Sequence, residues 1–90
     1  MRTVELEFRG INHQHLGLYF EELGGKRVTD AFPFMYVAEE WQGQIVNEEE
    51  ISITSTFKVN RVFIRFQAEN EEILNQLVTN YRVKTRRIGG

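Results

Sequence analysis

The sequence predicts an α+β fold in a single domain over residues 1–90, with a mostly antiparallel sheet and two helices on one of its faces. Three observations support this prediction. A chain of 90 residues can build one hydrophobic core but not two. Several segments alternate polar and apolar residues, which is typical of half-buried strands. Two other segments space apolar residues by three and four, as amphipathic helices do, so the predicted order is strand, helix, four strands, helix.

The first strand and the first helix are predicted from short apolar patterns. In residues 3–9 every second residue is apolar, so the apolar side chains share one side of a strand. From Asn12, a residue type that favours helix N-caps, the apolar spacing becomes helical. Gly24 and Gly25 then supply the backbone freedom that ends the helix. The apolar stripe of this helix consists of Leu16, Tyr19, Phe20 and Leu23.

Four strands are predicted between the two helices. Residues 28–38 are rich in aromatic side chains without helical spacing, and Pro33 places that part of the strand at a sheet edge, a bulge or a strand start. Residues 41–46 form a short strand, and residues 47–50 are interpreted as a solvated acidic turn. Because their connections are short, successive strands are expected to pair as antiparallel hairpins. The last two strands are predicted at residues 51–59 and 62–68.

The second helix is predicted over residues 70–81. Asn70 is its expected N-cap, and Glu71 and Glu72 lie in the first turn, where the helix dipole favours anions. Both helices should cover the same face of the sheet, because the strands have one apolar and one mixed face. The other face is expected to stay open. The basic segment at residues 84–90 is predicted to be a flexible tail.

Composition excludes several classes of protein. The chain has no cysteine, which excludes a disulfide framework, a thiolate zinc site and a nucleophilic thiol, and which favours a cytoplasmic location. No apolar run approaches the roughly 20 residues that span a bilayer. A net charge of −2 argues against nucleic acid as the main partner. Phosphate-binding, hydrolase and zinc-protease motifs are missing, so we expect no enzyme activity, no cofactor and no metal.

The two histidines and the acidic segment are the remaining candidates for acid–base or metal chemistry. His13 and His15 are two residues apart, so on a helix they point in different directions and are interpreted as solvated first-turn side chains. The alternative is a functional pair in an extended stretch. The glutamates at 48–50 lack the ligand spacing of a calcium loop and are interpreted as a charged hairpin turn.

The open face of the sheet is the predicted binding surface. Cationic and aromatic side chains on one strand, beside Thr54 and Thr56 of its expected neighbour, would form a platform on which anionic ligands or bases can stack. The alternative is that the arginines pair with Glu5 and Glu7 of the first strand. The predicted binding residues are Arg61, Phe63, Arg65 and, from the neighbouring strand, Lys58.

The C-terminal glycines suggest another function. Gly89 and Gly90 resemble the tails of ubiquitin-like and sulfur-carrier proteins such as MoaD, the small subunit of molybdopterin synthase. Those carriers have a β-grasp core that opens with a hairpin before its helix, whereas here a helix directly follows the first strand. The alternative to a carrier terminus is a frayed chain end.

Two wider resemblances follow from the element order and three segments. The order resembles one half of the TATA-binding-protein fold. The segments at residues 16–25 (LGLYFEELGG), 32–34 (FPF) and 57–60 (FKVN) resemble a small bacterial domain that occurs alone or as the C-terminal part of MoaD-related proteins. The similarity covers nearly the whole chain and implies an accessory link to molybdenum-cofactor biosynthesis, without an established activity. The MoaD module itself is missing here.

The leading hypothesis is therefore a non-enzymatic accessory or binding domain that uses its open sheet face or an edge for a protein partner or a small ligand. One alternative is a sulfur carrier acting through Gly90, and another is a single-stranded nucleic-acid binder using Phe63 and the arginines. A strand beside Pro33 is also a candidate for homodimerisation by edge pairing. Ligand identity, pathway and oligomeric state do not follow from the sequence.

Overall fold

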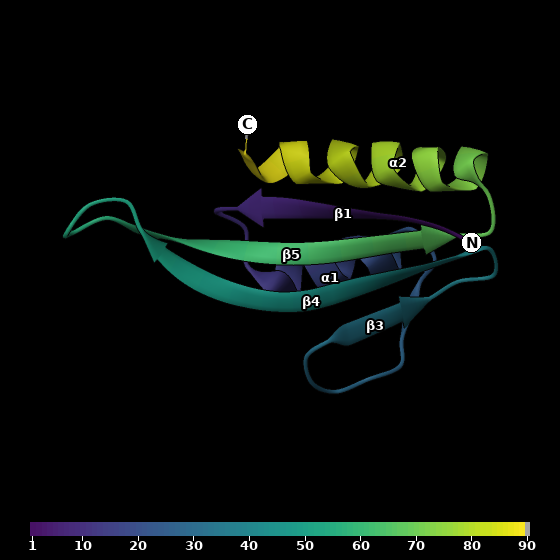
Figure 1. The fold of residues 1–90 in the computed structure, drawn as a ribbon, viewed down its shortest axis with the longest axis horizontal. Coiled ribbons are helices and arrows are strands. Elements are labelled where there is room, and N and C mark those ends of the chain that lie inside the picture. The colour runs from purple at the N-terminus through teal and green to yellow at the C-terminus, as the bar shows by residue number, and fades with distance from the viewer. Residues whose placement is uncertain (90) are drawn as a thin grey trace.

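The computed structural model describes the backbone of residues 1–89 and the side chains of residues 1–86. Its order of strand, helix, four strands and helix confirms the predicted α+β fold (Figure 1). The strands form one sheet in the order β1-β5-β4-β3-β2, and every neighbouring pair is antiparallel. The elements are β1 (Arg2–Arg9), α1 (His13–Glu22), β2 (Lys26–Arg27), β3 (Phe34–Val37), β4 (Trp41–Ser52), β5 (Lys58–Ala68) and α2 (Glu71–Gly89).

The acidic segment predicted as a turn is part of a strand in the structure. Residues 47–50 lie inside β4, and the chain instead turns within the predicted strand at 51–59, where the N–H of Ile53 donates to the carbonyl of Phe57 at 2.8 Å. The glutamates fit a strand because their cross-strand partners on β5 include Arg61, opposite Glu49. The resulting β4–β5 hairpin extends beyond the rest of the sheet (Figure 1).

The predicted strand at residues 28–38 is divided in the structure. Its first part is a loop between the two-residue β2 and β3, and Pro33 immediately precedes β3, so the strand-start alternative is confirmed. Thr29 closes the loop, because its hydroxyl donates to the carbonyl of Pro33 and accepts from the N–H of Met35, both at 3.0 Å. In the described part of the chain, the sheet edges are β1 and β2.

Both predicted N-caps are confirmed. Asn12 accepts from the N–H of His15 at 3.0 Å, and Asn70 accepts from the N–H of Ile73 at 2.9 Å. The predicted end of the second helix at residue 81 is wrong, because α2 continues to Gly89 through the segment expected to be a tail. Gly90 lies outside the described residues. None of the helices described is long and apolar enough to span a lipid bilayer.

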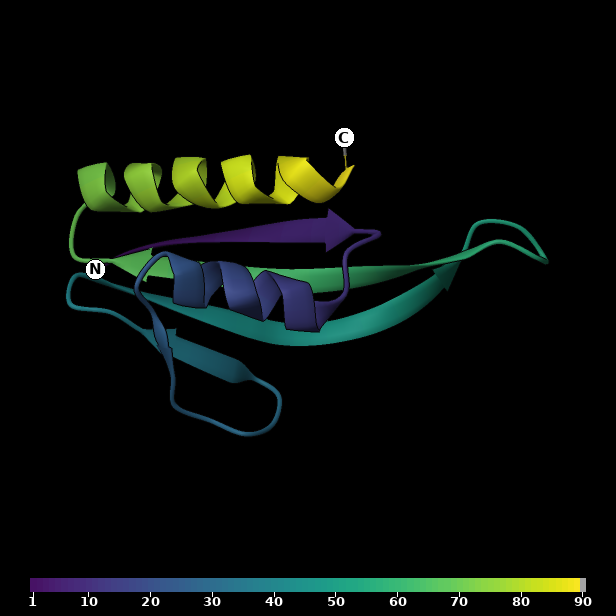
Figure 2. The same cartoon turned by 180° about the vertical axis from the view of Figure 1, so that it is seen from behind.

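The two helices cover the same face of the sheet, as predicted (Figure 2). The rings of Phe20 on α1 and Tyr81 on α2 have centroids 4.6 Å apart, and both contact Phe66 of β5. Phe20 lies so close to β4 at Gly43 that a Cβ there would overlap its ring. The core is therefore built where α1 and α2 meet over β4 and β5. Its fully buried large side chains are Leu16, Phe20, Ile45, Val62, Ile64, Phe66 and Tyr81.

Candidate functional site

The predicted binding residues lie on the open face of the sheet, but beside neighbours that differ from those expected. Arg61, Phe63 and Arg65 alternate with buried residues along β5 and face away from the helices. Thr54 and Thr56 lie in the turn after β4, so their predicted position beside these residues is wrong. The actual neighbours are Glu5, Glu7 and Arg9 on β1 and Gln44, Asn47 and Glu49 on β4.

The arginines of this face are paired with carboxylates, which confirms the alternative proposed from the sequence. Arg61 Nε lies 3.1 Å from Glu7 Oε1, and its guanidinium also forms an ion pair with Glu49. Arg65 Nη2 lies 3.4 Å from Glu5 Oε1. Because oppositely charged side chains alternate across three strands, the face presents little net field to a phosphate.

Two further predicted binding residues contribute differently. Phe63 lies under the guanidinium of Arg61, whose Cζ is 5.1 Å from the ring centroid, so the cation and the aromatic ring contact each other. Lys58 lies at the start of β5, where its Nζ is 3.8 Å from Glu50 Oε1 and its side chain is 56% exposed. The four predicted residues thus form no single cluster, and their role in binding stays a prediction.

A β-bulge in β4 creates a polar site that the sequence did not predict. Ile45 pairs with Ile64 and Asn47 pairs with Phe63, so Val46 is an extra residue on β4. Because side chains alternate between the two faces of a strand, one extra residue moves every later side chain to the opposite face. Glu48 therefore pairs with the buried Val62 and lies on the face covered by the helices.

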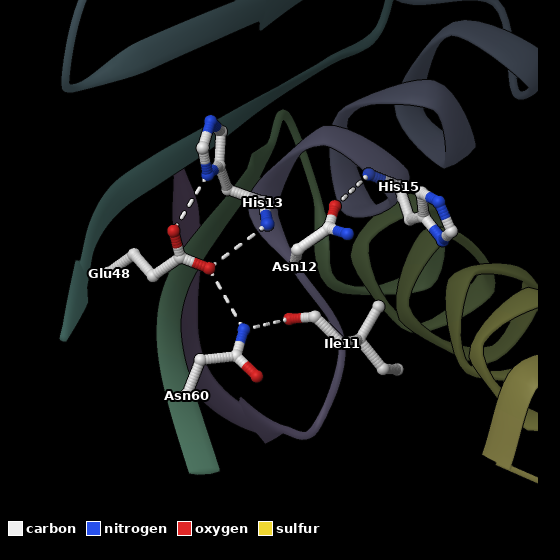
Figure 3. A network of polar contacts seen from close by, with 6 residues as sticks. All are labelled: Ile11, Asn12, His13, His15, Glu48 and Asn60. Atoms are coloured by element: carbon white, nitrogen blue, oxygen red, sulfur yellow. Dashed lines mark hydrogen bonds and ion pairs between the residues drawn. The ribbon is translucent and has the colours of Figure 1, made fainter. Parts of the chain in front are cut away.

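Glu48 is the centre of a hydrogen-bond network at the start of α1 (Figure 3). Its Oε1 lies 2.8 Å from His13 Nδ1, and its Oε2 accepts from the backbone N–H of His13 at 3.2 Å and from Asn60 Nδ2 at 2.9 Å. Asn60 Nδ2 also donates to the carbonyl of Ile11 at 2.6 Å. The network thus ties the loop before α1 to both strands of the β4–β5 hairpin.

The carboxylate of Glu48 acts as a helix cap supplied from another element. The first turn of α1 contains no acidic residue of its own, although its unpaired N–H groups and the helix dipole favour an anion there. Burial alone would raise the pKa of Glu48, but the hydrogen bonds from His13 and Asn60 outweigh burial and leave its pKa below the ordinary value. Glu48 is therefore ionised at neutral pH.

This arrangement corrects the interpretation of the histidines. His13 is only partly exposed, and its ring stacks on Phe34 with centroids 5.6 Å apart and an angle of 8° between the ring planes. His15 is exposed, as predicted. Because a carboxylate only accepts hydrogen bonds, the pairing with Glu48 places a proton on Nδ1 of His13. Within the described residues, no three His, Asp or Glu side chains are placed to hold a metal ion.

A cavity of about 420 Å³ adjoins His13, between α1 and the segment that carries β2 and β3. This volume is within the range of small-molecule sites. The sequence did not indicate the cavity, because its lining comes from separate elements that only the tertiary fold brings together. Its polar and aromatic lining includes His13, Gln14, Glu21, Arg27, Phe34 and Tyr36.

Tyr36 is a buried residue among those that line this cavity. Its side chain is buried, and its hydroxyl lies so close to Gly17 of α1 that a Cβ there would overlap it. Burial, together with the nearby carboxylate of Glu21, raises the pKa of Tyr36 even though Arg27 acts in the opposite direction. The hydroxyl is therefore protonated at neutral pH and can donate a hydrogen bond.

Comparison with known proteins complements this geometry. No curated protein matches the chain significantly. The family model of the archaeal MoaD-like proteins matches residues 4–90, which is nearly the full length. The chain therefore belongs to the archaeal MoaD-like protein family.

Proposed function

We propose that the protein is a non-enzymatic accessory domain of molybdenum-cofactor biosynthesis that binds a protein partner or a small ligand. The family match over residues 4–90 is the observation that carries this proposal, because the family is named for its likeness to MoaD. The link to the cofactor pathway rests on that likeness. The binding role rests on the geometry of the polar side chains.

The polar side chains support binding rather than catalysis. Glu48 is engaged by three hydrogen bonds that hold α1 in place, and Arg61 and Arg65 are paired with carboxylates. Such groups stabilise the fold. The cavity beside His13 offers polar groups to a ligand, and the hairpin turn exposes Ile53 and Phe57, with 54% and 58% of their surface accessible.

Deletion of the gene in the native host tests the link to the cofactor. We expect the cellular content of molybdenum cofactor, measured on extracted cofactor by liquid chromatography, to fall and to recover when the wild-type gene is returned. An accessory role predicts a partial loss, since the pathway enzymes remain. An unchanged cofactor content would refute the proposed link.

A sulfur carrier acting through Gly90 is the second candidate, because the family match extends to this residue. Such a carrier must offer a free terminal carboxylate in an extended segment, so the last turn of α2 before Gly89 would have to unwind. Intact mass spectrometry after co-expression with adenylating enzymes tests this role. Exchange of oxygen for sulfur at the C-terminus supports a carrier. An unchanged mass, together with full complementation of the gene deletion by a chain lacking Gly90, rules it out.

A further inference from the structure

Along its outer edge, β1 has backbone groups that no described strand pairs. In the described part of the chain, β1 pairs with β5 alone. The N–H of Gly10, directly after β1, donates to the carbonyl of Asn60 at 3.0 Å, so the even-numbered residues of β1 direct their hydrogen bonds to β5. The N–H and carbonyl groups of the alternate residues therefore face outward. These outward-facing residues are Thr3, Glu5, Glu7 and Arg9.

A groove of about 270 Å³ lies between this edge and the second half of α2. On the strand side, the apolar side chains of Leu6 and Phe8 line the groove and are only partly buried. α2 runs along β1 at this edge of the sheet (Figure 1), so the side chains of a strand added to β1 would pack against this helix. The remaining lining residues are Glu7 from β1 and Arg82, Thr85 and Arg86 from α2.

The helix side of the groove carries two arginines without an acidic partner. Within the described residues, Arg82 and Arg86 form no ion pair, whereas the arginines of the open face are paired with glutamates. Glu7 also lines the groove, but its carboxylate lies 3.1 Å from Arg61 Nε and 3.6 Å from Arg9 Nη2. The groove therefore has an excess of positive charge on its α2 side, which attracts carboxylates.

The spacing of the two arginines fits an extended peptide. Arg82 and Arg86 are about one helical turn apart, which is about 6 Å along the helix axis. Alternate side chains of a strand point to the same face and are about 6.6–6.8 Å apart. A strand that pairs with β1 can therefore place two carboxylates, two residues apart, beside both arginines. Its intervening side chains would lie near Glu5 and Glu7, where further acidic residues are disfavoured.

We propose that the outer edge of β1 binds an extended acidic peptide of a partner protein as an additional strand. The backbone of the peptide pairs with the outward-facing groups of β1, and acidic side chains at alternate positions contact Arg82 and Arg86. Apolar side chains on the same face of the peptide cover Leu6 and Phe8. This site rests on the proposed role of the protein as a binding domain and names the chemistry of its partner. The cofactor measurement is a separate experiment, so either can fail without the other.

Amide hydrogen exchange of the ¹⁵N-labelled protein tests the strand pairing directly. The probe is the capped peptide acetyl-TVKETETV-amide, whose valines and glutamates share one face of a strand. Its binding should be saturable, and at saturation the N–H groups of Glu5 and Glu7 should exchange at least about tenfold more slowly. The N–H of Leu6 faces β5 already, so its exchange should change by less than about twofold.

Two altered peptides separate strand pairing from charge. The peptide acetyl-TVTEEKTV-amide has the same composition, but its adjacent glutamates point to opposite faces of a strand, so it should bind about threefold more weakly. N-methylation of the two central residues of the probe removes an N–H that would pair with β1 in either strand direction. This change should weaken binding about fivefold, as expected for one lost backbone hydrogen bond.

Substitutions on α2 assign the charged contacts. The double variant Arg82→Gln and Arg86→Gln should weaken binding of the probe about tenfold, because each exposed ion pair contributes roughly threefold. The matched control, Lys26→Gln with Arg27→Gln, removes two positive charges at the opposite edge of the sheet and should leave binding within about twofold. Urea unfolding of each variant shows that it is folded.

Four results would overturn the proposal. The first is the absence of saturable binding of the probe at millimolar concentration. The second is binding without slower exchange at Glu5 and Glu7, which would show that the peptide does not pair with β1. The third is equal weakening by the two double variants, which would show that general charge determines binding. The fourth is a dimer in sedimentation equilibrium whose Glu5 and Glu7 N–H groups are already protected, which would show that a second copy occupies the edge.

Discussion

Replacement of Glu48 by glutamine should destabilise the protein by about 2–4 kcal/mol. The carboxylate accepts three hydrogen bonds in the structure, and its side chain is only 23% exposed. A glutamine has one acceptor oxygen, so its NH₂ group would face at least one donor from His13 or Asn60. A lost charged hydrogen bond costs roughly 1.5–3 kcal/mol, and loss of the anion at the start of α1 adds roughly 0.3–1 kcal/mol.

Urea unfolding followed by circular dichroism measures this change in the free energy of unfolding. The matched control is Glu50→Gln, because Glu50 lies on the same strand, its ion pair with Lys58 is 3.8 Å long, and its side chain is 67% exposed. We expect the control to change stability by less than about 0.5 kcal/mol. Equal effects of the two substitutions would refute the proposed role of Glu48 as a helix cap.

The stability difference between wild type and Glu48→Gln should also depend on pH, with a definite sign. The pKa of Glu48 is lowered in the folded state, so ionisation of this carboxylate favours folding. The difference in stability between wild type and Glu48→Gln should be full above the ordinary pKa of 4.5 and should shrink as the pH falls through the lowered folded value. A difference that stays constant through acidic pH would contradict this assignment.

Substitutions at three further positions test the packing and the cap of α1, each by the free energy of urea unfolding. Gly43→Ala should destabilise by about 1–3 kcal/mol, because its Cβ would overlap the buried ring of Phe20, and a change below about 0.5 kcal/mol would show that the ring moves freely. Tyr81→Phe should cost about 1–2 kcal/mol, since it removes a buried hydrogen bond of 2.6 Å to the carbonyl of Leu16, and an unchanged midpoint would argue against that bond. Asn12→Ala should cost about 1 kcal/mol and Asn12→Asp should retain the cap, so equal losses in both would refute capping at this position.

The fold class followed from the sequence because its evidence is local. The alternation of Val4, Leu6 and Phe8 and the capping residues Asn12 and Asn70 act within a few residues of the chain, so their effects do not depend on the rest of the fold. Antiparallel pairing followed from the short connections. The burial of both helices on one face followed from the apolar face of the strands.

The interpretation of the acidic segment failed for a physical reason. Consecutive glutamates favour a solvated turn when only local composition is considered. In the folded chain Glu49 pairs with Arg61 across the sheet, and Glu48 is held by side chains more than ten residues away. The fold therefore pairs these carboxylates with side chains distant in sequence, whereas local composition predicts that water solvates them.

The sequence by itself determined the α+β class, the order of the elements and the two N-caps, since these depend on periodicity and on neighbouring residues. Only the tertiary structure decided which face Glu48 occupies, because the extra residue Val46 in β4 reverses the faces of the strand after it. The same fold brought Arg27 and Glu21 to one cavity. Register and long-range packing set these positions, and neither leaves a periodic signal in the chain.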